Sequence, residues 1–160
     1  MTTLEYCAAR RQAETPTSVR VLKAVPETGH GYRPDPKSRT AGEIAWLLAR
    51  AEAALLTLLK TGSVEWKEEP APARIADVVS AFERDATAVN ARIAALDEAG
   101  WQKKGKLMMD GQAWEDTIEA MVWGFLFDSI HHRGQLTTYL RPMGSKVPAI
   151  YGPSADDSGH

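Results

Sequence analysis

The strongest constraint on the fold of this chain is a helical repeat of apolar residues. In residues 75–96 apolar side chains return every three or four positions, so they line one face of an α-helix. This face is formed by Ile75, Val78, Val79, Phe82, Ala86, Val89, Ile93 and Leu96. Because proline is tolerated in a first helical turn, we expect the helix to begin near Pro72 or Ala73 and to end before Gly100.

Residues 40–62 repeat this pattern, and both of their ends carry a sequence signal. Thr40 and Glu43 match a capping box, in which each side chain accepts a hydrogen bond from the other residue's backbone amide. Gly62 is a natural stop, because glycine readily adopts the left-handed conformation that ends many helices. The apolar face consists of Ile44, Leu47, Leu48, Ala51, Leu55, Leu58 and Leu59. A second helix is predicted here.

Two further segments complete the helical pattern. Residues 3–23 predict a weaker helix that Pro16 kinks or divides, because a proline inside a helix removes a hydrogen bond. Residues 113–140 predict the last helix, with Asp110 as a candidate N-cap and Pro142 just beyond its end. The predicted buried face of this helix consists of Ile118, Met121, Phe125, Asp128, His132, Leu136 and Tyr139.

These helices predict an all-α fold, an antiparallel four-helix bundle. A chain of 160 residues is long enough for one complete core, so we expect a single domain over residues 1–152. The polar residues 153–160 are expected to form a flexible C-terminal tail, whereas residues 147–151 are apolar enough to pack back on the helices. Residues 101–109 are expected to form an extended connector or one strand.

Charge and composition argue against several classes of partner. The net charge is −2 and no basic run is present, so neither nucleic acid nor an anionic membrane has an electrostatic basis for binding. No apolar run approaches the length of a transmembrane helix, and residues 1–11 lack the apolar core of a signal peptide. A cytoplasmic location is expected. The single cysteine, Cys7, cannot form an internal disulfide and is either a buried residue or a nucleophile.

The candidate site lies on the last helix, where Asp128 and His132 interrupt the apolar face. A spacing of four residues stacks the two side chains on one side of a helix, close enough to share a metal ion. A buried carboxylate without a partner is costly, so the pair is predicted either to hydrogen-bond in the core or to bind a divalent metal. His131 lies about 100° around the helix from His132, either facing the open end of this site or at the surface.

The run that begins at His131 carries a family resemblance. Residues 131–144 read His-His-Arg-Gly-Gln-Leu-Thr-Thr-Tyr-Leu-Arg-Pro-Met-Gly, which resembles the end of the last helix in the DinB-like (DinB/YfiT) superfamily. Residues 32–34 and 38–46 resemble the start of that superfamily's second helix. The likeness covers most of residues 3–152 and implies a four-helix bundle.

Members of the superfamily typically hold a divalent metal, such as zinc or nickel, with three histidines, one from the second helix and two from the last. Carried over to this sequence, the third histidine falls on His132, the second on Asp128 and the first on Leu47. The resemblance thus implies a zinc or nickel site with Asp128 and His132 as metal ligands and an apolar residue at the third position. Glu43, Glu14 and His131 are alternative ligands; otherwise Glu43 belongs to the capping box, Glu14 is solvated and His131 lies at the surface.

Two functions are implied by the resemblance. The first is a metal-dependent enzyme, such as a thiol-dependent transferase or isomerase, in which the metal activates a small thiol or a water and His131 is the catalytic proton carrier. The second is a non-catalytic helical bundle that has lost its metal and binds a small ligand or a partner, which Leu47 favours. Homodimers are common among relatives, so a homodimer is expected in either case.

Overall fold

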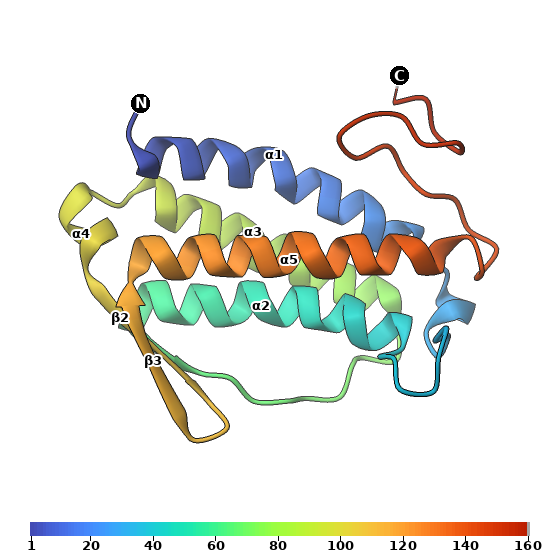
Figure 1. The fold of residues 1–160 in the computed structure, drawn as a ribbon, viewed down its shortest axis with the longest axis horizontal. Coiled ribbons are helices and arrows are strands. Elements are labelled where there is room, and N and C mark those ends of the chain that lie inside the picture. Colours follow the sequence, from blue (N-terminus) through green and yellow to red (C-terminus); the bar gives the residue numbers. More distant parts are fainter. Residues whose placement is uncertain (160) are drawn as a thin grey trace.

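In the computed structural model the chain is mostly helical, with a small three-stranded sheet at one end of the long helices (Figure 1). The structure describes residues 1–159; His160, the last residue of the predicted tail, lies outside them. In chain order the elements are α1 (Thr3–Ala24), the short 3-10 helix η1 (Glu27–Gly29), α2 (Ala41–Thr61), β1 (Ser63–Glu65), α3 (Ile75–Ala94), α4 (Glu98–Gln102), β2 (Lys104–Met109), β3 (Gln112–Thr117) and α5 (Ile118–Leu140). The prediction of a mostly helical fold is therefore confirmed, but the chain is not all-α, because three segments pair as strands. None of the helices in residues 1–159 has the length and hydrophobicity that crossing a bilayer requires.

The ends of α2 confirm the sequence prediction. Thr40 Oγ1 accepts a hydrogen bond from the Glu43 amide at 3.1 Å, and Glu43 Oε2 accepts one from the Thr40 amide at 2.6 Å. Gly62 follows the helix with a φ of 80°, in the left-handed region that a Cβ atom disfavours. α1 also begins with a capping box, and it continues through Pro16 as a single helix.

The long helices do not simply alternate in direction. The first halves of α2 and α3 share one apolar cluster with the last turns of α1 and α5, and the opposite ends share another. α2 and α3 therefore run parallel to each other and antiparallel to α1 and α5 (Figure 1). The antiparallel arrangement predicted from the sequence is wrong for α2 and α3, because residues 62–74 cross back along the helices. Such a connection spans roughly 40 Å when extended, more than the length of about 30 Å that α2 requires.

β2 and β3 form a hairpin, although part of β3 was predicted from the sequence to belong to the last helix. Asp110 (φ 50°) and Gly111 (φ 76°) make its two-residue turn, in which both residues are left-handed. Residues 112–117 pair with β2 in antiparallel register, so Asp110 is a turn residue and not the N-cap of a helix. The N-cap of α5 is Thr117, and β1 completes the sheet by pairing in parallel with β2.

The interior consists of two apolar clusters with buried polar residues between them. In this polar layer Arg11 of α1 forms an ion pair with Glu52 of α2, with 2.5 Å between Nη2 and Oε2. Arg11 Nε also donates a hydrogen bond to Asn90 of α3 at 3.0 Å. Glu14 of α1 and Arg133 of α5 form a second buried ion pair at 2.7 Å. Each of these four charges is thus paired with an opposite charge inside the bundle.

The C-terminal segment, residues 141–159, folds back beside α1 and α5 (Figure 1). Val147 and Ile150 pack against an apolar cluster, as predicted for residues 147–151. The Asp157 carboxylate accepts a hydrogen bond from a backbone amide of this stretch at 2.8 Å. The first part of the predicted tail is thus bonded to the segment that precedes it.

Candidate functional site

The inward face of α5 differs from the face predicted by sequence. Asp128 has 55% of its side chain exposed and His132 has 20%, while His131 is exposed. The buried residues in the middle of the helix are Leu126, Ser129 and Arg133. The burial predicted for Asp128 is wrong, because Arg133 has a buried carboxylate partner on α1 and takes the inward position.

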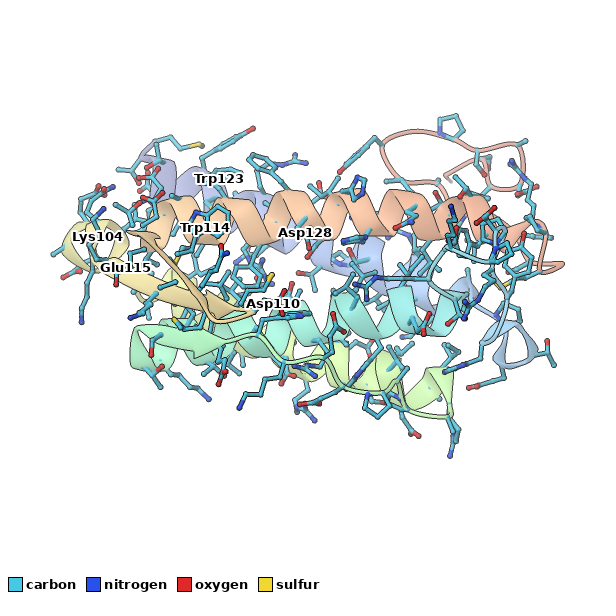
Figure 2. All side chains as sticks on the ribbon, turned by 60° about the horizontal axis from the view of Figure 1, so that its bottom comes forward. Lys104, Asp110, Trp114, Glu115, Trp123 and Asp128 are labelled. Atoms are coloured by element: carbon cyan, nitrogen blue, oxygen red, sulfur yellow. The ribbon has the colours of Figure 1, made fainter. Side chains whose placement is uncertain are left out.

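Asp128 and His132 nevertheless form a pair on the outer side of α5, where Figure 2 places Asp128 about halfway along the helix. Asp128 Oδ1 lies 3.4 Å from His132 Nε2, and His132 Nδ1 lies 3.1 Å from Gln135 Oε1. When Nδ1–H donates to Gln135, the Nε2 atom on the other side of the ring faces the Asp128 carboxylate. The His131 ring packs edge-on against the His132 ring, with 4.9 Å between the centroids.

The residues around this pair do not supply a three-ligand metal site. Leu47, which aligns with the first histidine of the superfamily, has no donor atom. Within residues 1–159 no three His, Cys, Asp or Glu side chains lie close enough together to hold an ion. Glu43 is held in the capping box of α2, and Glu14 is held in a buried ion pair. Metal binding at this pair stays a prediction, and it requires ligands from outside the chain.

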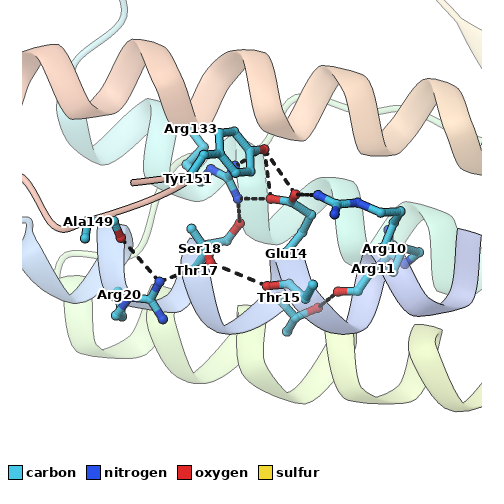
Figure 3. Close-up of polar contacts among 11 residues, drawn as sticks. Arg10, Arg11, Glu14, Thr15, Thr17, Ser18, Arg20, Arg133, Ala149 and Tyr151 are labelled. Carbon is cyan, nitrogen blue, oxygen red and sulfur yellow. Dashed lines mark hydrogen bonds and ion pairs between the residues drawn. The ribbon is translucent and has the colours of Figure 1, made fainter. Parts of the chain in front are cut away.

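A second polar group joins α1, α5 and the C-terminal segment (Figure 3). Arg133 Nη1 donates to Glu14 Oε2 at 2.7 Å and to Ser18 Oγ at 3.2 Å. Arg133 Nη2 donates to the Tyr151 hydroxyl at 2.7 Å, and that hydroxyl lies 3.1 Å from both Glu14 oxygens. Arg10 donates to Glu14 Oε1 at 2.6 Å. Glu14 is only 5% exposed, so a solvated Glu14 is excluded, and the carboxylate belongs to this network.

These partners keep Glu14 ionised. Burial by itself raises the pKa of a carboxyl group, but the hydrogen bond and charge of Arg133 act in the opposite direction. With further hydrogen bonds from Tyr151 and Arg10, they hold the pKa of Glu14 below its ordinary value. The network therefore combines one carboxylate and two guanidinium groups with a phenol.

Two other buried groups have raised pKa values. Burial raises the pKa of Glu52 even though the charge and hydrogen bond of Arg11 oppose the shift. Burial also raises the pKa of the Cys7 thiol to about 11. Because the thiolate is the reactive form of cysteine and Cys7 is fully buried, this residue is part of the core and not a nucleophile.

A groove of about 620 Å³ runs between α1 and α5 above the Glu14 carboxylate; we call it the aromatic groove. Its walls include the rings of Tyr6, Trp123 and Phe127, and Tyr151 lies at one end. Trp123 packs against Tyr6 at 6.1 Å and stacks on Phe127 at 5.6 Å between ring centroids. Tyr6 is 51% exposed, Phe127 61% and Tyr151 68%, so these rings remain accessible from solvent.

This groove and the network beneath it were not predicted from the sequence. The sequence indicated Arg133 only as part of the motif at the end of the last helix. It indicated Glu14 only as an alternative metal ligand. One feature of the sequence could have indicated the network. Glu14 and Arg133 carry opposite charges, and both lie at inward positions of their helices. The parallel packing of α1 and α5, which brings the two together, has no counterpart in the local sequence.

Comparison with known proteins places the chain in a family. The sequence model described as the DinB family matches residues 2–159, nearly the whole chain. The chain belongs to the DinB family. A DinB-like protein from Bacillus cereus ATCC 10987 is 19% identical, with a TM-score of 0.77 over 92% of this chain and 97% of that one. A DinB-like protein from Bacillus subtilis is 16% identical, with a TM-score of 0.69 over 88% and 93% of the two chains.

No curated protein matches this member of the DinB family. At these identities the two solved structures establish that the fold is shared and carry no information about ligand or reaction. The function has to be argued from the side chains of this chain.

Proposed function

We propose that this DinB-family chain is a binding protein built on a four-helix bundle and that it holds a small aromatic molecule in the aromatic groove. The observation that carries the proposal is the groove itself, with aromatic rings along its walls and a charged network beneath. Binding sites for small molecules are typically concave, about 300–1,000 Å³ in volume, and mostly apolar with a few polar groups that fix orientation. The groove lies within this range at about 620 Å³.

The rings favour an aromatic ligand over an aliphatic one. Trp123 and its two neighbours already pack ring against ring, so a flat ligand extends an existing stack. An aromatic pair contributes about 0.5–1.5 kcal/mol beyond the burial of its surface. A flexible aliphatic chain gains only the burial.

Titration with N-phenylnaphthylamine, an uncharged dye that fluoresces in apolar surroundings, tests this proposal. The protein should bind the dye, and Trp123→Ala should weaken binding roughly tenfold, since that factor corresponds to about 1.4 kcal/mol. Trp114→Ala is the matched control, because Trp114 is 69% exposed on β3 and lies outside the groove. Absence of dye binding, or equal weakening by the two substitutions, would contradict the proposal.

A metal-dependent enzyme is the second candidate, and one observation favours it. Gln135 is placed to orient His132 so that its Nε2 faces Asp128, the kind of support that metal-binding histidines usually have. Two protein ligands are fewer than catalytic zinc normally has, so a zinc or nickel ion would depend on water or a small thiol for its other ligands.

Metal analysis of untagged protein after incubation with zinc or nickel separates the two candidates. Near-stoichiometric metal that is lost in His132→Ala and kept in His131→Ala would favour the enzyme with Asp128 and His132 as its protein ligands, since His131 is exposed. Protein that retains no metal would leave the binding protein as the better candidate. The metal result is independent of dye binding, because Asp128 and His132 do not line the aromatic groove.

The expected homodimer gives the groove another occupant. Tyr6 and Phe127 are exposed apolar side chains on neighbouring helices, and such surfaces are often buried between subunits. Light scattering measures the molecular mass over a range of concentrations. If a second copy covers the groove, dye binding should decrease as the dimer forms, which would assign this surface to self-association.

A further inference from the structure

The Tyr151 hydroxyl acts as both acceptor and donor at its position in the network. It accepts a hydrogen bond from Arg133 Nη2 at 2.7 Å and lies 3.1 Å from each oxygen of Glu14, to which it donates. Arg133 is a pure donor, and an ionised Glu14 is a pure acceptor. A hydroxyl is a small group that satisfies both neighbours at once, because it accepts and donates through one oxygen atom.

Tyr151 is held at this position by its side chain and not by its backbone. Its residue is 68% exposed and lies in the irregular C-terminal segment, beyond the last helix. Within residues 1–159 its backbone amide and carbonyl make no hydrogen bond, so the side chain supplies its polar attachment. The guanidinium lies 5.5 Å from the ring centroid, a contact that any aromatic ring at this position reproduces.

The two buried charges exclude the closest alternatives to a hydroxyl. A carboxylate at this position would accept from Arg133, but it has no proton to donate to Glu14, and its oxygens would face the Glu14 oxygens, which lie 3.1 Å from the present hydroxyl. A ring without a polar group would leave Arg133 Nη2 and the Glu14 carboxylate without this partner, and unpaired buried polar groups are costly. A methyl ether could accept from Arg133 but could not donate to Glu14.

We propose that the aromatic groove recognises a phenol, whose hydroxyl replaces that of Tyr151 between Arg133 and Glu14 while its ring lies along the groove. This inference rests on the proposed function and names the chemical class of its ligand. Tyr151 then acts as a resident substitute whose hydroxyl bridges Arg133 Nη2 and the Glu14 carboxylate until a ligand arrives. A ligand without a hydroxyl binds over the rings alone and leaves Tyr151 in place.

Three related probes test the phenol: naphthol, its methyl ether and naphthoate, each titrated into the full chain by calorimetry. Naphthol should bind about tenfold more tightly than either of the others, because a hydrogen bond to a charged group contributes about 1.5–3 kcal/mol and part of it is already present with Tyr151. Equal binding of the three probes would overturn the phenol but leave the aromatic groove as a binding site. No binding of any probe, together with no dye binding, would overturn both.

Tyr151→Phe provides the second measurement, since it removes the competing hydroxyl and preserves the ring. The affinity for naphthol should rise roughly three- to tenfold, the equivalent of one ordinary hydrogen bond, and the preference over the methyl ether should remain. Tyr32→Phe is the control, because that ring packs on Tyr139 away from the groove and should leave the affinity unchanged. A naphthol affinity that does not change in Tyr151→Phe would overturn the proposed position of the hydroxyl.

Discussion

Replacing Arg133 by methionine tests whether burial decides how much each arginine around Glu14 stabilises the fold. Two guanidinium groups contact this carboxylate at nearly the same distance, Arg133 at 2.7 Å and Arg10 at 2.6 Å. Their surroundings differ, because the Arg133 side chain is 2% exposed and the Arg10 side chain 41%. Exposed ion pairs contribute about 0–1 kcal/mol, whereas removing one partner of a buried pair costs about 3–5 kcal/mol.

We expect Arg133→Met to lower the free energy of unfolding by about 3 kcal/mol. This is the lower end of the range, because Arg10 and Tyr151 still donate to Glu14 after the change. For a chain of this length the loss corresponds to a fall in Tm of roughly 6–12 °C. Arg10→Met, the matched control, should cost less than about 1 kcal/mol. Replacing both Glu14 and Arg133 by methionine should recover most of the loss, because no buried charge is then left unpaired.

Equilibrium unfolding in urea, followed by circular dichroism, measures all of these free energies. Equal losses for Arg133→Met and Arg10→Met would refute the reasoning, since distance to Glu14 and not burial would then set the energy. A double variant as unstable as Arg133→Met would refute it too, because lost packing and not an uncompensated charge would explain the loss.

Glu14→Gln should flatten the acid side of the stability curve. Because the pKa of Glu14 is lowered in the folded state, its carboxylate stabilises the fold above the unfolded pKa of about 4.3, and this contribution disappears as the pH falls through the folded value. Urea unfolding measures the free energy of unfolding at each pH in this range. Parallel curves of this free energy against pH for Glu14→Gln and the unchanged protein would contradict the stabilising role of the Glu14 carboxylate. Cys7 should resist Ellman's reagent at a pH of about 8 in the folded protein and react once urea unfolds it, since burial raises its pKa to about 11; rapid labelling of folded protein would count against this. Gly111→Ala should lower stability by about 1 kcal/mol because the residue has a φ of 76°. Gly134→Ala should raise stability by a similar amount, because Gly134 is exposed on a helix and, apart from its own helical turn, no atom lies within 4 Å of the added carbon. Thermal unfolding in which both glycine substitutions change stability in the same direction would contradict this reasoning.

Helices could be predicted from this sequence where both ends carry their own signal. α2 is confirmed from its capping box to Gly62, because caps depend on residues within one turn of each other. Strand β3 shows the opposite case. Residues 112–117 could not be predicted locally, since they become a strand only by pairing with β2.

Which face of α5 points inward is determined by a contact with a residue that is distant in the sequence. The face that carries Asp128 and the face that carries Ser129 are one residue apart, about 100° around the helix, and both continue into apolar positions. The choice is made by the ion pair between Arg133 and Glu14, which lie 119 residues apart in the chain. Local spacing contains no information about such a partner, so the Asp128–His132 pair was expected in the core and lies at the surface instead.

Synthesis on the ribosome makes α5 the last of the long helices, yet both apolar clusters need it. Leu136 and Leu140 belong to one cluster, and Ile118 and Val122 belong to the other. A nascent chain that has reached only α3 therefore has no complete core in either half, and the apolar faces of its first three long helices remain open to solvent. Neither half can close before α5 has left the exit tunnel, and until then those faces are surfaces on which chaperones can act.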